Sequence, residues 1–273
     1  AGSRLRVVSS RSQEVALKSG CFACEVVVEG DDAEAVADRF VEHAAKDHDW
    51  SYPEHSLRNY AINYAAAVER VDGPTERLSE IGEVTVHPVT ADRIDDWLRL
   101  FDREGFAGNP DWASCYCREP HEPPAADDPE RLWSDNRAAM IERLRNGSTF
   151  GYLAYVDGKV AGWVNASTRD TYGKHHTPEP DGPDPTSVIG VSCFVISPPY
   201  RKHGVAGALL DWVIADTGAR GGAWVEAYPL LSPEAGDPGH FRGPRHMYDA
   251  RGFEPVDSRE HETVVRRPAE RPA

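Results

Sequence analysis

The sequence predicts an α/β protein in which a mixed central sheet is flanked by helices and preceded by a small α+β domain. Two observations point to this class. From Val84 onward, segments of strand periodicity alternate with segments of helical periodicity, and residues 188–196 form a nearly continuous apolar run typical of a strand buried on both faces. Upstream of Val84, two short strand patterns and two helical patterns end at Asp72-Gly73-Pro74, which predicts a domain boundary near residues 72–84.

The first domain, residues 1–80, is predicted to fold as strand, turn, strand and then two helices. Its β-branched run Val26–Val28 ends at a turn signal that contains Gly30. Apolar residues at helical spacing then recur over residues 32–46 and 57–71.

The second domain, residues 84–267, is predicted to follow the order strand, helix, long loop, helix, hairpin, strand, helix, strand, short helix and two closing strands. Asp157-Gly158 predicts the hairpin, because this pair favours positive φ at both central positions of a two-residue turn. Residues 171–185 predict a mobile loop and residues 268–273 a flexible tail. The predicted strands and helices are 84–89, 91–104, 134–145, 150–155, 160–165, 188–196, 205–217, 223–228, 247–250, 253–256 and 263–266, with a loop over 105–124.

The composition excludes several classes of function. Thirty basic and 45 acidic residues give a net charge of −15, which repels nucleic acid and attracts cations. No apolar run approaches the length of a membrane span. Five unevenly spaced cysteines and the absence of a signal-peptide pattern predict a protein of the reducing cytoplasm. The sequence leaves the oligomeric state open, a homodimer included.

The most informative segment joins the long apolar strand to the helix that follows it through a glycine-containing turn. A strand, a turn and a helix in this order can form an anion site, because free backbone N–H groups and the positive end of the helix dipole converge there. Gly204, Ala206 and Gly207 are small enough to let an anion reach the backbone, and Arg201 adds positive charge. The spacing is neither that of a dinucleotide fingerprint nor that of a nucleoside-triphosphate loop, and an ordinary strand-to-helix connection is the alternative.

The run Arg-Lys-His-Gly-Val-Ala at residues 201–206 resembles the Arg/Gln-x-x-Gly-x-Gly/Ala loop that binds the pyrophosphate of acyl-CoA in the GNAT superfamily of N-acyltransferases. The order of elements from residue 84 to 267 follows that family, as does Tyr248 ahead of the pair Gly252-Phe253. Residues 112–117, Trp-Ala-Ser-Cys-Tyr-Cys, further resemble an uncharacterised bacterial branch of the superfamily, which brings no known acceptor with it.

The resemblance implies an acetyl-CoA-dependent N-acetyltransferase in which a neutral amine attacks the thioester directly. It assigns stabilisation of the thioester oxygen to a backbone N–H of the strand around Phe194–Ile196. It places Tyr248 where a tyrosine protonates the departing CoA thiolate, with packing against Phe253 as the alternative. The residues assigned to the cofactor are Phe194, Val195, Ile196, Arg201, Lys202, His203, Gly204, Val205, Ala206 and Gly207.

Glu226 is the candidate for the base. It lies on the buried strand over residues 223–228, where its side chain could face the cleft and accept the proton that the amine must lose before attack. A carboxylate that only binds the positive charge of the substrate is the alternative.

Cys115 and Cys117 alternate across one residue, so in an extended segment both side chains point to the same side. They could line the acceptor pocket, form a redox pair or hold a metal together with His121, and two buried thiols are the simpler interpretation. Cys193 lies within a buried strand and is predicted to pack there.

Cys21, Cys24, His43 and His48 have the spacing of metal ligands, with two residues between the cysteines, 18 between Cys24 and His43, and four between the histidines. Two features oppose a metal: positions five apart on a helix differ by roughly 140° around its axis, and the central spacing exceeds the usual ~12 residues of a ββα zinc module. The run Glu42–His48 resembles a small uncharacterised bacterial domain, whose first cysteine lies further upstream. Structural zinc is therefore one hypothesis, and surface histidines with ordinary thiols are the other.

The function predicted from these features is transfer of an acetyl group to the amine of a small cationic molecule. A protein amine is an alternative acceptor, and a non-catalytic acyl-CoA-sensing or metal-sensing module is an alternative of another class. The negative charge disfavours a tRNA acceptor.

Overall fold

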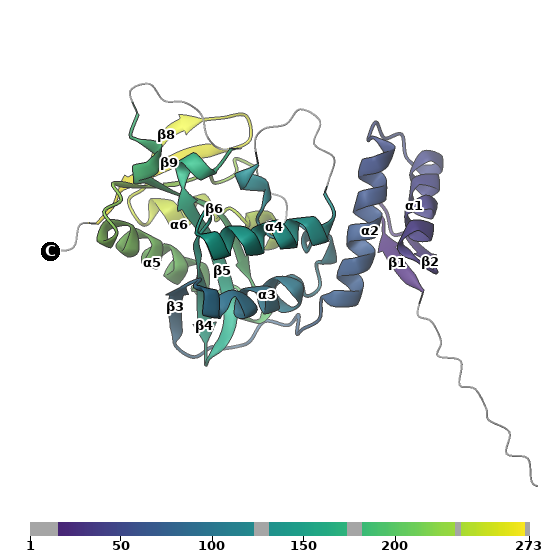
Figure 1. Cartoon of the computed structure of the whole chain (residues 1–273), viewed down its shortest axis with the longest axis horizontal. Helices are drawn as coiled ribbons and strands as arrows, with labels where there is room; N and C mark the ends of the chain where they lie inside the picture. The colour runs from purple at the N-terminus through teal and green to yellow at the C-terminus, as the bar shows by residue number, and fades with distance from the viewer. Residues whose placement is uncertain (1–15, 123–130, 174–181, 233–235, 271–273) are drawn as a thin grey trace, which may run out of the picture.

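The computed structural model describes residues 16–122, 131–173, 182–232 and 236–270, which form a small N-terminal unit and a larger α/β unit (Figure 1). The small unit contains an antiparallel pair of strands, β1 (Leu17–Gly20) and β2 (Val27–Gly30), and two helices, α1 (Ala33–Asp47) and α2 (Glu54–Arg70). Asp32 caps α1 by accepting a hydrogen bond from the Ala35 amide at 2.8 Å. The core of this unit is built on Val36, Phe40, Leu57 and Ala61.

A seven-stranded sheet in the order β3-β4-β5-β6-β7-β9-β8 forms the larger unit. Its strands are β3 (Val84–Pro88), β4 (Gly151–Val156), β5 (Lys159–Thr168), β6 (Val188–Ile196), β7 (Trp224–Ala227), β8 (Glu254–Ser258) and β9 (Thr263–Pro268). The hairpin between β4 and β5 turns through Asp157 and Gly158, which have φ of 50° and 74°. The predicted class, a mixed sheet flanked by helices after a small α+β segment, is confirmed.

Two neighbouring strands of the sheet, β6 and β7, are paired over only part of the length of β6. β6 and β7 are parallel and pair from Val188 opposite Trp224 to Val191 opposite Ala227, where β7 ends. The other neighbouring strands are antiparallel, and β6 continues to Ile196. The last residues of β6 therefore present an edge that β7 does not cover.

Helices cover both faces of the sheet, as the strand alternation requires. Tyr152 and Ala154 of β4 face a core with α5 (Val205–Ala219) and α6 (Arg245–Asp249). Leu153 faces the opposite core, which contains residues of α3 (Ile94–Asp102) and α4 (Trp133–Asn146).

Helix α2 joins the two units. Ala61 and Ala65 pack in the core of the small unit, whereas Ala67 packs in the core that contains α3 and α4. Asn63 donates to the Arg131 carbonyl at 3.0 Å and accepts from the Trp133 amide at 2.8 Å. The small unit therefore rests on the segment that leads into α4. The domain limits at residues 80 and 84 stay a prediction.

The structure corrects two predicted boundaries. The helix expected from residue 91 begins at Ile94, because residues 91–93 form a 3₁₀ turn. The tail expected from residue 268 is paired at its start, since β9 reaches Pro268 and the Ala269 amide donates to the Ala223 carbonyl at 2.9 Å. Most of the loop predicted over 171–185 lies outside the described residues. Within the described ranges, no helix combines the length and the apolar character that crossing a bilayer demands.

Candidate functional site

A cavity of about 680 Å³ lies beside the part of β6 that extends past the end of β7. Its lining comes from four segments: the loop before α4 (residues 105–120), the end of β6 (192–196), the turn into α5 (200–207) and the segment through α6 (237–251). All the residues that the sequence assigned to the cofactor line this cavity except His203, whose ring nitrogen Nε2 contacts the Leu78 carbonyl at 2.8 Å.

The turn into α5 presents a row of backbone amides to the cavity. Lys202 and Gly204 have φ of 63° and 81°, so the chain passes through two left-handed residues just before the helix begins at Val205. Among the residues that the structure describes, none accepts a hydrogen bond from the amides of residues 202–207. These amides and the positive end of α5 have the chemistry to bind an anion, and residues 202–207 are called the cradle from here on.

Three cations surround this cradle in a protein that is acidic overall. Arg201 donates to the Ile196 carbonyl at 3.0 Å, and burial lowers the pKa of its guanidinium. Lys202 pairs with Asp237 at 2.8 Å, which lowers the pKa of that carboxyl. Arg251 lies against Gly207, where the position of a Cβ would be 2.8 Å from Arg251 Nη2. A side chain at residue 207 would displace this guanidinium.

The open edge of β6 is partly occupied by the chain itself. The Phe194 amide donates to the Phe241 carbonyl at 2.6 Å, so this predicted oxyanion donor has a partner in the structure. Because successive amides point to opposite edges of a strand, Ile196 faces the same edge as Phe194. The segment around Phe241 was not identified from the sequence, since it reaches β6 only through tertiary packing.

Three thiols line the cavity: Cys115, Cys117 and Cys193. Tyr116 and Cys117 both have positive φ, 47° and 56°, a conformation that costs a non-glycine residue about 1 kcal/mol or more and turns this loop sharply. A hydrogen bond with Cys117 lowers the pKa of the Cys115 thiol to about 7. Burial raises the pKa of Cys117 well above its usual range. The pocket-lining interpretation of Cys115 and Cys117 is the one that this geometry favours, and Cys193 joins them.

His121 is a neutral imidazole whose two ring nitrogens are both engaged in hydrogen bonds. Its Nδ1 donates to the Thr171 carbonyl at 3.2 Å, and its Nε2 accepts from the Asn165 amide at 3.0 Å. Among the described residues, Cys115, Cys117 and His121 do not gather into a metal-sized cluster.

The environment of His121 predicts acid sensitivity. Burial lowers its pKa to about 4, below the value of about 6.5 in an unfolded chain. The unfolded state therefore takes up the proton first, and the free energy of unfolding falls as the pH drops from about 6.5 toward 4. Urea titrations from pH 7 to 4.5 give the free energy of unfolding at each pH. This free energy should fall less steeply with decreasing pH in His121→Gln than in wild type. Equal slopes would contradict this account.

Tyr248 is buried in the core next to the cavity. Its hydroxyl donates to the Arg242 carbonyl at 2.6 Å, its ring packs edge-on against Phe253, and it does not line the cavity. The acid role stays a prediction, and it would require the hydroxyl to leave the Arg242 carbonyl.

Glu226 is also buried, at 1% exposure. It lies on the part of β7 that is still paired with β6, opposite Gly190, and does not line the cavity. Its carboxylate accepts from Arg169 at 3.3 Å, from Arg266 at 2.7 Å and from the Tyr228 hydroxyl at 2.8 Å. The base role stays a prediction, and these contacts favour an ion-pair role inside the sheet.

Comparison with known proteins gives one family match. Residues 109–229 match the model of the acetyltransferase (GNAT) family, a range that contains β6, the turn and α5. No curated protein matches the sequence.

Solved structures with a similar fold include three acetyltransferases. An N-acetyltransferase from Staphylococcus aureus Mu50 has 14% identity and a TM-score of 0.42, covering 69% of this chain and 100% of its own. The GNAT domain of PAT from S. lividans has 18% identity and a TM-score of 0.44, covering 68% and 91%. The PaiA N-acetyltransferase from Thermoplasma acidophilum, in complex with coenzyme A, has 10% identity and a TM-score of 0.41, covering 68% and 99%.

Proposed function

Because this chain contains a domain of the GNAT acetyltransferase family, we propose that it transfers the acetyl group of acetyl-CoA to the amine of a small cationic molecule. The observation that carries the proposal is the cradle at residues 202–207, where amides without an acceptor among the described residues, a helix N-terminus and three cations border one cavity. A diphosphate matches these features, because its oxygens accept hydrogen bonds from several amides and its charge is opposite to that of the side chains.

In the proposed reaction, the neutral amine attacks the carbonyl carbon of the thioester. The C–N bond forms, the C–S bond breaks, and the CoA thiolate takes a proton, so the products are an amide and free CoA. The edge of β6 at Phe194 and Ile196 is proposed to face the thioester oxygen. Tyr248 stays the proposed donor of the proton, with Glu226 as the proposed acceptor of the proton from the amine.

Two histidines offer another acceptor for that proton. His240 and His246 line the cavity, whereas Glu226 does not. A neutral imidazole nitrogen can accept the proton that an attacking amine loses. The pH profile of kcat/KM should therefore change in His240→Gln or His246→Gln if one of them is the base.

The charge of the acceptor is inferred from the acidity of the whole protein and from two carboxylates in the cavity, whose basic side chains are assigned to the diphosphate. Among the described lining residues, the carboxylates are Glu119 on the loop before α4 and Asp237 beside Lys202. With a net charge of −15, the protein attracts cations from solution. A protein amine is the second candidate acceptor, and acyl-CoA sensing without turnover is the alternative outside catalysis.

The direct test is incubation of the protein with acetyl-CoA and a panel of diamines, aminoglycosides and amine-bearing peptides. Mass spectrometry should find an acceptor heavier by one acetyl group, together with free CoA. If only the peptides were acetylated, the acceptor would be a protein amine and not a small molecule. Binding of acetyl-CoA with no acetylated product and no CoA release would favour the sensor.

The reactivity of Cys115 provides an independent probe of the cavity. With a thiol pKa of about 7, Cys115 should react with iodoacetamide near neutral pH. Acetyl-CoA at ten times its Kd should slow this reaction about tenfold, because only the unoccupied fraction reacts.

Peptide mass spectrometry can follow Cys115 and free glutathione, added as the control, in one sample. Glutathione does not depend on the cavity, so acetyl-CoA should leave its alkylation rate unchanged. Equal rates at Cys115 with and without acetyl-CoA would contradict cofactor binding in this cavity.

A further inference from the structure

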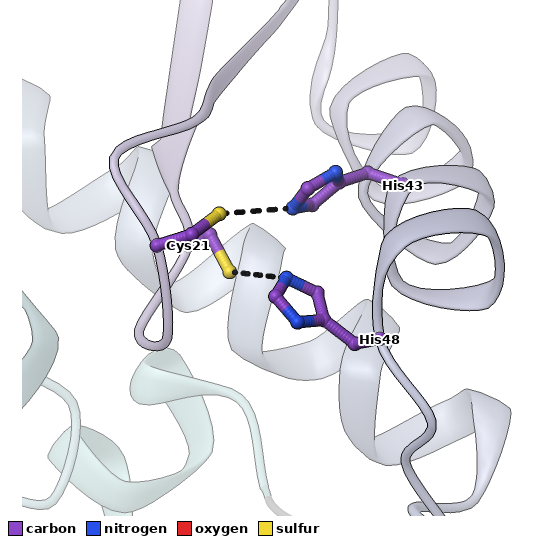
Figure 2. Close-up of side chains that lie close together, drawn as sticks. Cys21, His43 and His48 are labelled. Atoms are coloured by element: carbon purple, nitrogen blue, oxygen red, sulfur yellow. Dashed lines mark hydrogen bonds between the residues drawn. The ribbon is translucent and has the colours of Figure 1, made fainter.

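Two cysteines and two histidines of the small unit meet at one point, and none of them lines the cavity (Figure 2). Cys21 and Cys24 lie in the turn between β1 and β2, His43 lies near the end of α1, and His48 follows that helix. The distance from Cys21 Sγ to His48 Nε2 is 3.5 Å, and that from Cys24 Sγ to His43 Nε2 is 3.4 Å. The four ligand atoms all lie within 4.8 Å of one another.

The end of α1 removes one of the two objections that the sequence raised against this cluster, the offset of the histidines around the helix. On a continuous helix, His43 and His48 would point about 140° apart. The helix ends at Asp47, and His48 has extended backbone angles, φ −135° and ψ 141°. The change of backbone direction brings its ring back toward the cysteine turn, as Figure 2 shows.

The two measured S···N distances match the edges of a tetrahedral metal site. With metal–sulfur bonds of about 2.3 Å and metal–nitrogen bonds of about 2.0 Å, a tetrahedron has S···N edges of roughly 3.5 Å. Two sulfurs and two imidazole nitrogens in this geometry are a zinc set. We propose that Cys21, Cys24, His43 and His48 bind one zinc ion as a closed structural site.

Groups behind the ligands already hold the two rings in position. Asp47 Oδ2 lies 2.9 Å from His43 Nδ1, so Nδ1–H donates to the carboxylate and Nε2 keeps its lone pair for the metal. The His48 ring stacks on Trp50 with a centroid distance of 4.1 Å and an angle of 2°. A carboxylate behind a ligating histidine is the usual support for a zinc site.

A metal cross-link would increase the stability of the small unit. Its core rests on a few side chains of two helices, and units of this size gain stability from a metal or from disulfides. Zinc would tie the β1–β2 turn to the end of α1. Four protein ligands leave no open position, so the ion would stabilise the unit and take no part in acetyl transfer.

The test uses the full-length protein and has a readout apart from activity. Elemental analysis should find about one zinc per wild-type chain. After chelation, added Co²⁺ should give the visible bands of a tetrahedral site together with a thiolate charge-transfer band. His55→Ala, an exposed histidine on α2, is the matched control and should bind metal like wild type. Cys24→Ser should bind no stoichiometric zinc.

A variant that keeps all four ligands addresses the case in which Cys24→Ser does not fold. Asp47→Asn should weaken zinc binding about 10–100-fold in a competition with a chromophoric chelator. Wild-type protein without zinc and without a tetrahedral Co²⁺ spectrum would overturn the proposal. Full metal content in Cys24→Ser would overturn it as well.

Discussion

Ala206→Glu should raise the KM for acetyl-CoA by about 100-fold or more while leaving the protein folded. Ala206 lies in the first turn of α5 and lines the cavity beside the row of amides. A carboxylate there would repel a diphosphate, and each 1.4 kcal/mol of lost binding is tenfold in affinity. The same carboxylate is favourable for the helix itself, because it lies near the positive end of the dipole.

Ala206→Gln is the matched control, since it adds nearly the same volume without charge. Its KM should rise by less than about tenfold, and thermal melting should show both variants to be as stable as wild type. Equal effects of Glu and Gln would attribute the loss to bulk, and no effect of either would place the diphosphate outside the cradle.

Glu226→Gln should destabilise the protein by about 3–5 kcal/mol, which corresponds to a fall in Tm of roughly 6–20 °C for a unit of this size. The carboxylate is buried between Arg169 and Arg266, whose side chains are 4% and 9% exposed. The neutral amide would remove a negative charge that both buried guanidinium groups contact.

Differential scanning calorimetry and initial rates together separate the two roles of Glu226. Glu254→Gln, an exposed carboxylate on β8, is the control and should change Tm by less than about 1 °C. A variant Glu226→Gln with wild-type Tm but a greatly reduced kcat would establish the base role and refute the ion-pair interpretation.

The parts of the site that the sequence predicted are local in the chain. The turn at residues 201–207 was predictable because strand, turn and helix follow one another, so their geometry depends little on the rest of the fold. The proposed zinc ligands were predictable in pairs for the same reason. What decides between metal and ordinary side chains is the end of α1 at Asp47, and no sequence signal marks that end clearly.

The positions of the proposed reacting groups depend on strand register and on segments distant in the sequence. Local sequence patterns carry no information about either. Glu226 has the pattern of a strand residue, but its distance from the opening depends on where β7 stops pairing with β6. The Phe241 carbonyl meets the Phe194 amide from a segment almost fifty residues away. Cys193 was predicted to pack because its strand is apolar, although the same strand also forms the cavity wall.

The position of α2 has a consequence for any attempt to divide the protein. Its Arg70 donates to the Ala113 carbonyl at 3.0 Å and lies over the Trp133 ring at 4.3 Å. A protease that cut between Arg70 and Val84 would therefore leave two fragments that stay attached to each other. A fragment that begins at Val84 would lack α2, and its Trp133 and the loop at residues 112–117 would become exposed to water.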